Sequence, residues 1–143
     1  MNLWQLSSTP EEDRYETYMD AGNDLRRRIK RGDAPAILAV MSIREQRARI
    51  TGNERIAAPC CAYILRQLKR REEVATLRHI YGDAFLLVAA YSPENERMRK
   101  LAADIAASHH RTSDERAYYG TAIALIQRDD AEADDKFGQN VWT

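Results

Sequence analysis

The spacing of apolar residues along most of the chain is that of amphipathic helices. Near the start, apolar or small residues recur at intervals of three and four positions, at Tyr15, Tyr18, Gly22, Leu25 and Ile29. This interval places them on one face of an α-helix. The strict alternation of apolar and polar residues that marks a half-buried strand is almost absent. The pattern therefore predicts an all-α fold.

Helix-starting and helix-breaking residues divide this pattern into about six segments. Thr9 and Pro10 suit the start of the first helix, and Gly32 and Gly52 mark breaks after the first two. Pro59 falls inside the third segment, where it predicts either a kink or a later start. The six predicted helices cover about residues 10–31, 33–51, 53–70, 72–91, 93–111 and 113–129. Their apolar spacing predicts that Met41 on the second is buried and that Ile64 on the third faces the core.

The fourth predicted helix carries two apolar stripes. One runs through Val74, Leu77, Tyr81, Phe85 and Val88, and the other through Ile80, Ala84 and Leu87. A helix that is apolar on more than one side is typically surrounded by other elements. We therefore expect this helix to be the centre of the core, with Leu77, Phe85 and Leu87 fully buried.

The predicted helices form pairs with a regular spacing. The first, third and fifth begin near Asp13, Glu54 and Glu96, a period of about 41–42 residues. The middle pair, from Arg55 to Ile80, resembles a HEAT-type repeat. This resemblance implies three antiparallel hairpins in a short stack that binds proteins, and it supplies no catalytic residue. An ordinary orthogonal helical bundle is the alternative.

Length and composition favour one globular domain. The chain has 143 residues, of which 44% are hydrophobic, and this length is near the commonest domain size. We expect a single helical domain over residues 1–129 and an acidic tail over 130–143. The sequence shows neither a signal peptide nor an apolar run long enough for a membrane span, so the predicted location is cytoplasmic. The adjacent Cys60 and Cys61 are expected to lie unbridged on a buried helix face.

Charge is balanced overall but clustered locally. Lysine plus arginine and aspartate plus glutamate number 22 each, which disfavours general binding to nucleic acid or to a membrane surface. If the first, third and fifth helices run parallel, the basic residues at their ends line one edge. The candidates for binding a protein partner through this basic edge are Arg27, Arg28, Arg31, Arg66, Arg70, Arg71 and Arg111.

The C-terminal segment combines an acidic run with large apolar residues. The acids include Asp129, Asp130, Asp134 and Asp135, and they precede Phe137 and Trp142. Charge that steers and aromatics that anchor are typical of a docking segment. Its target could be a partner or the chain's own basic edge, and an inert terminus is the alternative.

Motifs for catalysis, metals or cofactors are not found. The sequence lacks a glycine-rich phosphate loop and the Cys and His spacings of metal sites, so we expect no enzyme, metal or cofactor. His79 and Asp83 are the one pair placed for acid–base work on a helix, although a solvated pair is commoner.

These features favour a non-catalytic module that masks or inhibits a partner protein. An immunity protein, antitoxin or adaptor of bacterial type, acting on a partner such as a toxin or an effector, fits best. The alternatives are a regulatory nucleic-acid-binding protein that uses the basic edge, a small helical enzyme or ligand-binding protein, and a structural or assembly protein. Steep salt dependence would distinguish nucleic-acid binding.

Overall fold

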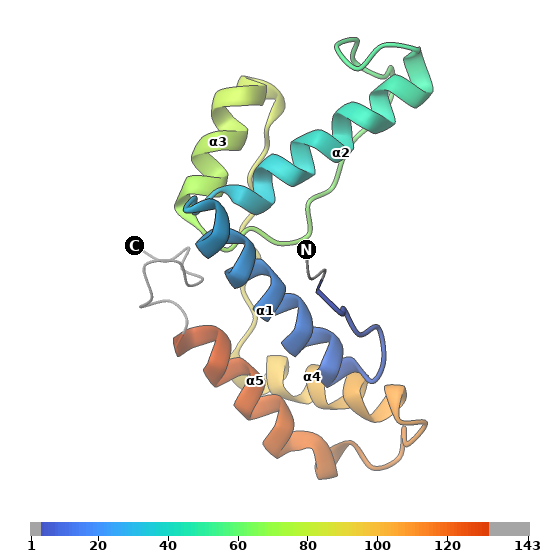
Figure 1. Cartoon of the computed structure of the whole chain (residues 1–143). Coiled ribbons are helices and arrows are strands. Elements are labelled where there is room, and N and C mark those ends of the chain that lie inside the picture. Colours follow the sequence, from blue (N-terminus) through green and yellow to red (C-terminus); the bar gives the residue numbers. More distant parts are fainter. Residues whose placement is uncertain (1–3, 132–143) are drawn as a thin grey trace. The chain divides into compact units, whose positions relative to one another are not determined.

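The structure is a computed structural model, and it describes residues 4–131. Within this range the chain is helical without strands, as predicted (Figure 1). Its α-helices are α1 (Glu11–Ile29), α2 (Ala34–Thr51), α3 (Arg71–Tyr81), α4 (Glu94–Ser108) and α5 (Tyr119–Ala131). Two short 3-10 turns, Gly82–Ala84 and Glu115–Tyr118, precede an extended segment and α5 respectively. No helix in the described part of the chain is long and apolar enough to cross a membrane.

Local sequence explains the helix ends that were predicted correctly. Helix α1 carries acidic residues in its first turn and arginines in its last, which suits the helix dipole at both ends. Pro35 lies in the first turn of α2, where its missing N–H removes no helical hydrogen bond. Gly52 ends α2 with a φ of 76°, a left-handed conformation that glycine adopts without a steric penalty.

The described residues form two compact units, and the division falls within α1. The first unit comprises residues 4–24 and 88–131. Its core lies between α4 and α5, where Ala102 and Ile105 meet Ala122 and Leu125. Tyr15 of α1 packs against this cluster, together with Met98, Leu101, Tyr118 and Tyr119. The expectation of a single domain over residues 1–129 stays a prediction.

The second unit comprises residues 25–87, where α2 packs against α3. Its buried apolar residues are Ala34, Ala36, Ile43 and Leu77. Ala36 and Ile43 are seven residues apart and therefore share one face of α2. Leu77 of α3 is fully buried, as predicted.

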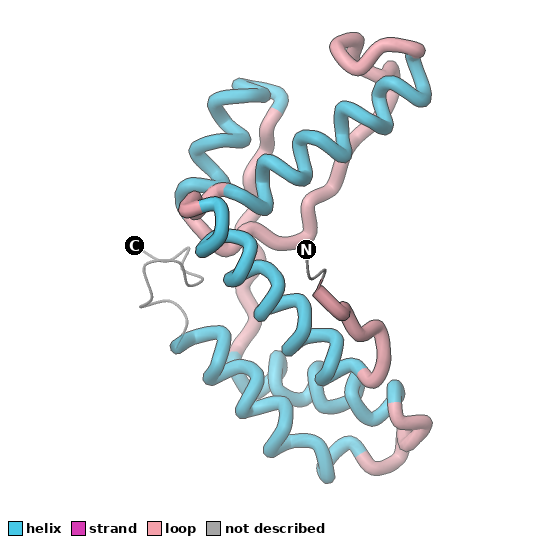
Figure 2. Tube along the Cα trace, in the orientation of Figure 1, coloured by secondary structure: helices cyan, strands magenta, loops and turns pink. Residues whose placement is uncertain are grey.

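The third predicted helix is not present. Residues 57–69 run as a turn and an extended segment between α2 and α3 (Figure 2). Pro59 cannot donate a backbone hydrogen bond, and Cys60 after it has a φ of 57°, which a helix cannot contain. The apolar spacing in this region was therefore misleading. The middle unit is not a helical hairpin, so the HEAT-like resemblance has no counterpart there.

The fourth predicted helix ends ten residues early, at Tyr81 rather than near Tyr91. Gly82 follows with φ 54° and ψ −129°, a conformation that strongly favours glycine and stops the helix. Residues 85–93 are extended instead (Figure 2). Phe85 is only half-buried and Leu87 is 43% exposed, so the prediction that both are fully buried is wrong.

Candidate partner-binding site

The second unit is organised around a buried ion pair. The guanidinium of Arg26, near the end of α1, lies 2.8 Å from a carboxylate oxygen of Glu73 in α3. The two side chains are only 4% and 3% exposed. The other Glu73 oxygen accepts hydrogen bonds from the backbone N–H groups of Lys69, at 2.6 Å, and Arg70, at 3.1 Å. Glu73 therefore satisfies donors at the start of α3 and joins that helix to the end of α1.

Asp33 forms a second polar connection in this unit. Arg31 donates two hydrogen bonds of 2.8 Å to its carboxylate, and the Thr76 hydroxyl of α3 donates another of 2.5 Å. The bonds from Arg31 lower the pKa of Asp33 to about 2; burial opposes this shift, and the Thr76 bond adds to it. The carboxylate thus ties the α1–α2 turn to α3 while it is ionised.

Acid should weaken this connection in a defined pH range. Because the pKa of Asp33 is lower in the folded protein than its ordinary value of 3.8, its stabilising contribution is complete above about pH 4 and is lost as the pH falls towards about 2. Urea unfolding of wild type and Asp33→Asn should therefore differ at pH 6 and converge near pH 2. A difference that does not change with pH would contradict this role.

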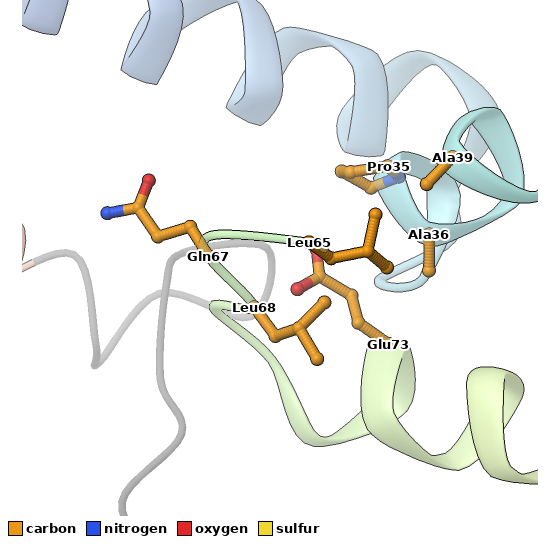
Figure 3. Close-up of a pocket in the computed structure, with 7 residues that line it drawn as sticks. All are labelled: Pro35, Ala36, Ala39, Leu65, Gln67, Leu68 and Glu73. Atoms are coloured by element: carbon orange, nitrogen blue, oxygen red, sulfur yellow. The ribbon is translucent and has the colours of Figure 1, made fainter. Parts of the chain in front are cut away.

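A small cavity lies beside the buried ion pair. Leu65 of the extended segment points toward Ala36 of α2, Leu68 lies on the side of Glu73, and Gln67 points away from both (Figure 3). Pro35, Ala36, Ala39 and Glu73 complete the lining. Its volume of about 60 Å³ is far below the roughly 300–1,000 Å³ of a typical small-molecule site. The cavity could hold water but not a metabolite.

The second unit exposes more large apolar side chains than it buries. Among its residues only two large ones, Ile43 and Leu77, are buried. The exposed aliphatic set consists of Ile29, Leu38, Met41, Ile50, Ile56, Ile64, Ile80, Leu86 and Leu87. Ile64 and Leu86 are 85% and 82% exposed. Exposed apolar residues that adjoin one another are typical of a surface that binds another protein, whereas single ones are ordinary.

Local geometry explains why these side chains face outward. On α2, Leu38 and Met41 are three residues apart and share a face, which lies opposite the buried face of Ala36 and Ile43. Met41 was predicted to be buried, and this prediction is wrong.

The extended segment shows the alternation expected of an extended chain. The Arg47 guanidinium carbon lies 5.9 Å from the centre of the Tyr63 ring, and Leu65 lines the cavity. Arg47 also lies 5.5 Å from the centre of the Tyr81 ring. Successive side chains of an extended chain point to opposite sides. Ile64, between two inward-facing residues, is therefore directed outward, although it was predicted to face the core.

The basic candidates of the second unit differ in their surroundings. Arg27, Arg28, Arg66 and Arg71 are exposed. Arg31 is bound to Asp33, and Arg70 is half-buried and donates to Glu72. Arg66 and Arg70 precede α3 instead of ending a helix, so the reasoning that placed them on an edge of parallel helices is wrong. Their role in partner binding stays a prediction.

The remaining candidates belong to the first unit or lie outside the described residues. Arg111 follows α4 and is exposed. Asp129 is half-buried and Asp130 is exposed, both on α5. Asp134, Asp135, Phe137 and Trp142 fall outside the described residues, so the docking-segment hypothesis stays a prediction.

The structure does not bring together the predicted pair of His79 and Asp83. His79 is exposed on α3, and Asp83 lies beyond the helix end in the 3-10 turn, with no hydrogen bond between them in the structure. Their predicted i, i+4 helical relationship is therefore wrong. His109 lies 2.5 Å from a Glu12 oxygen and stacks on Tyr118, a contact that ties α4 to the start of α1. No group of three or more metal-ligating side chains occurs in residues 4–131.

Comparison of the chain with protein-family models, curated proteins and solved structures finds no match. The exposed aliphatic set is the main feature of the candidate site, and helical periodicity missed it by assigning Met41, Ile64 and Leu87 to the core. Pro59 inside the third predicted helix could have revealed the exposure of Ile64, and Gly82 inside the fourth that of Leu87.

Proposed function

We propose that this chain is a non-catalytic protein-binding module and that the exposed aliphatic set is the centre of its interface. The excess of exposed over buried large apolar residues in the second unit carries this proposal. Covering apolar surface releases roughly 25 cal/mol per Å². Binding a partner would therefore recover stabilisation that this small core does not supply.

Exposed positive charge in the second unit favours an acidic partner. Arg27, Arg28, Arg66 and Arg71 are exposed in the same unit, and guanidinium groups bind carboxylates through paired hydrogen bonds. Protein interfaces commonly have an apolar centre and a polar rim. The partner we propose is a protein with an apolar patch bordered by aspartate and glutamate.

The form of this activity that we favour is masking or inhibition of the partner. An immunity protein, antitoxin or adaptor of bacterial type, working in the cytoplasm on a toxin or an effector, fits a small module that presents a binding surface. Such a surface requires no HEAT-like stack of hairpins. With balanced net charge, binding to nucleic acid is the less favoured function.

Replacing Leu38 and Met41 together by glutamine should weaken partner capture by at least about tenfold, because truncating a hot-spot side chain at the centre of an interface costs about 2 kcal/mol or more. The melting temperature should stay unchanged, since both side chains are exposed. Capture would be measured by photo-crosslinking in the native host, with the crosslinker at Ile64, followed by mass spectrometry.

A matched control comes from the same helix. Gln46 is exposed on α2 and lies about a third of a helical turn away from the face of Leu38 and Met41, so Gln46→Ala should leave the crosslinked product intact. Arg28→Glu with Arg71→Glu tests the rim separately and should reduce the rate of association more than the final yield. If the Leu38 and Met41 variant yields the same crosslinked product as wild type, the aliphatic set is not the interface.

A further inference from the structure

Cys60 and Cys61 form an exposed pair of adjacent thiols. Both are free, and both are exposed, which contradicts the expectation of a buried helix face. They lie between Pro59 and the extended segment that leads to α3, and Cys60 has a φ of 57°. Without a helix, nothing keeps the two side chains about 100° apart, and the physical objection to a bridge between them no longer applies.

Adjacent cysteines have a distinctive disulfide chemistry. Consecutive Cα atoms are about 3.8 Å apart across a trans peptide, whereas disulfides usually join Cα atoms roughly 4.4–6.8 Å apart. A bond between neighbours therefore closes a small strained ring. Strained, exposed disulfides are more easily reduced than structural ones, and this class includes the regulatory bonds.

We propose that Cys60 and Cys61 are a reversible redox site that closes to an intramolecular disulfide by exchange with a low-molecular-weight disulfide such as glutathione disulfide. One cysteine thiolate attacks a sulfur of glutathione disulfide, forming a mixed disulfide and releasing one glutathione. The second thiolate then attacks the protein sulfur of that mixed disulfide and displaces the other glutathione. Two protein thiols are oxidised, one glutathione disulfide is reduced, and the two thiol protons pass to the two glutathiones.

Oxidation of the cysteine pair would affect the segment that follows it. Tyr63 lies on Arg47 and Leu65 lines the cavity, so closing the ring at residues 60 and 61 changes the backbone immediately before two anchored side chains. Ile64 lies between them. We infer that ring formation changes how Ile64 is exposed to a partner, and this consequence rests on the proposed partner binding. Ring formation itself does not rest on it.

Intact-mass spectrometry of the full chain tests the proposal directly. Reduced protein is incubated with glutathione disulfide, and remaining thiols are then alkylated under denaturing conditions. We expect a product that has lost the mass of two hydrogen atoms, takes up no alkylating agent and returns to the starting mass with dithiothreitol. The two single variants, Cys60→Ser and Cys61→Ser, should each retain one glutathione on the remaining cysteine. Wild type should release its glutathione at least about tenfold faster than either variant, because the second attack is intramolecular.

A second variant separates adjacency from mere thiol content. Cys61→Ala with Gln127→Cys keeps two exposed thiols but moves the second one to α5, and it should accumulate glutathione adducts without closing a ring. Phenylarsine oxide, which needs two neighbouring thiols, should bind wild type and not the single serine variants. Stable glutathione adducts on wild type, a disulfide-linked dimer on a non-reducing gel, or unreacted thiols would each overturn the proposal.

Discussion

Replacing Glu73 by alanine is expected to lower the free energy of unfolding of the second unit by about 3–5 kcal/mol, because it breaks a buried ion pair by removing one partner. The substitution takes away the carboxylate to which Arg26 donates at 2.8 Å. It also removes the acceptor for the backbone N–H groups of Lys69 and Arg70. Each of these losses leaves a donor that water reaches poorly in the folded state.

Native-state hydrogen exchange is the appropriate measurement, since a chain of two units need not unfold in one step. Amides of α2 and α3 should lose protection in Glu73→Ala. Glu72→Ala, at the adjacent position, is the matched control, because the Glu72 side chain is 53% exposed and binds Arg70. Exposed pairs of this kind contribute less than about 1 kcal/mol. A loss below about 1 kcal/mol for Glu73→Ala would show that the ion pair does not organise this unit.

This ion pair also shows where sequence reasoning stops. Arg26 and Glu73 are 47 positions apart, and the periodicity of one helix contains no information about a partner on another. Arg26 lies in the last turn of α1 beside Arg27 and Arg28, where a basic residue is ordinarily explained by the helix dipole. Its burial comes from tertiary packing alone.

Most of the helical segments could be predicted because local signals agreed with one another. In α2, the apolar spacing, Pro35 and Gly52 all indicate the same boundaries, and in α4 the helix begins directly after Pro93. Around Pro59 and Gly82 the local signals conflicted, and the apolar spacing was given more weight than the breaker. A short apolar run such as residues 84–91 has no period that separates helix from extended chain, so the breaker should have decided it.

The same conflict between apolar spacing and helix breakers explains why the observed candidate site differs from the predicted one. Leu77 was correctly placed in the core because it lies before the break, on a helix that forms. Leu87 lies after the break, and its predicted burial depended on a helix that ends at Tyr81. Four of the nine residues of the exposed aliphatic set lie in segments that were predicted as helices and are not helical: Ile56, Ile64, Leu86 and Leu87. The prediction of a basic edge also depended on the third predicted helix, which does not form.

Replacing Ile105 by alanine is expected to destabilise the first unit by about 2–5 kcal/mol, the range for deleting a large buried aliphatic side chain. Ile105 is 0% exposed and lies in the cluster of Ala102, Ala122 and Leu125. Two of its three neighbours in this cluster, Ala102 and Ala122, are alanines on two helices that pack together, and alanine has little side chain with which to fill a void. Cavities that cannot collapse give the larger losses in this range.

Ile123→Ala provides the matched control, because Ile123 on α5 is 37% exposed and the same atoms are deleted with less loss of burial. Hydrogen exchange should show lost protection in α4 and α5 for Ile105→Ala and a clearly smaller change for Ile123→Ala. The amides of α2 and α3 show whether the two units unfold together. If the chain is a single cooperative domain, as its length suggests, they lose protection together with α4 and α5; if the two units unfold independently, they do not. Equal destabilisation by the two substitutions would mean that the α4–α5 cluster is not the core of the first unit.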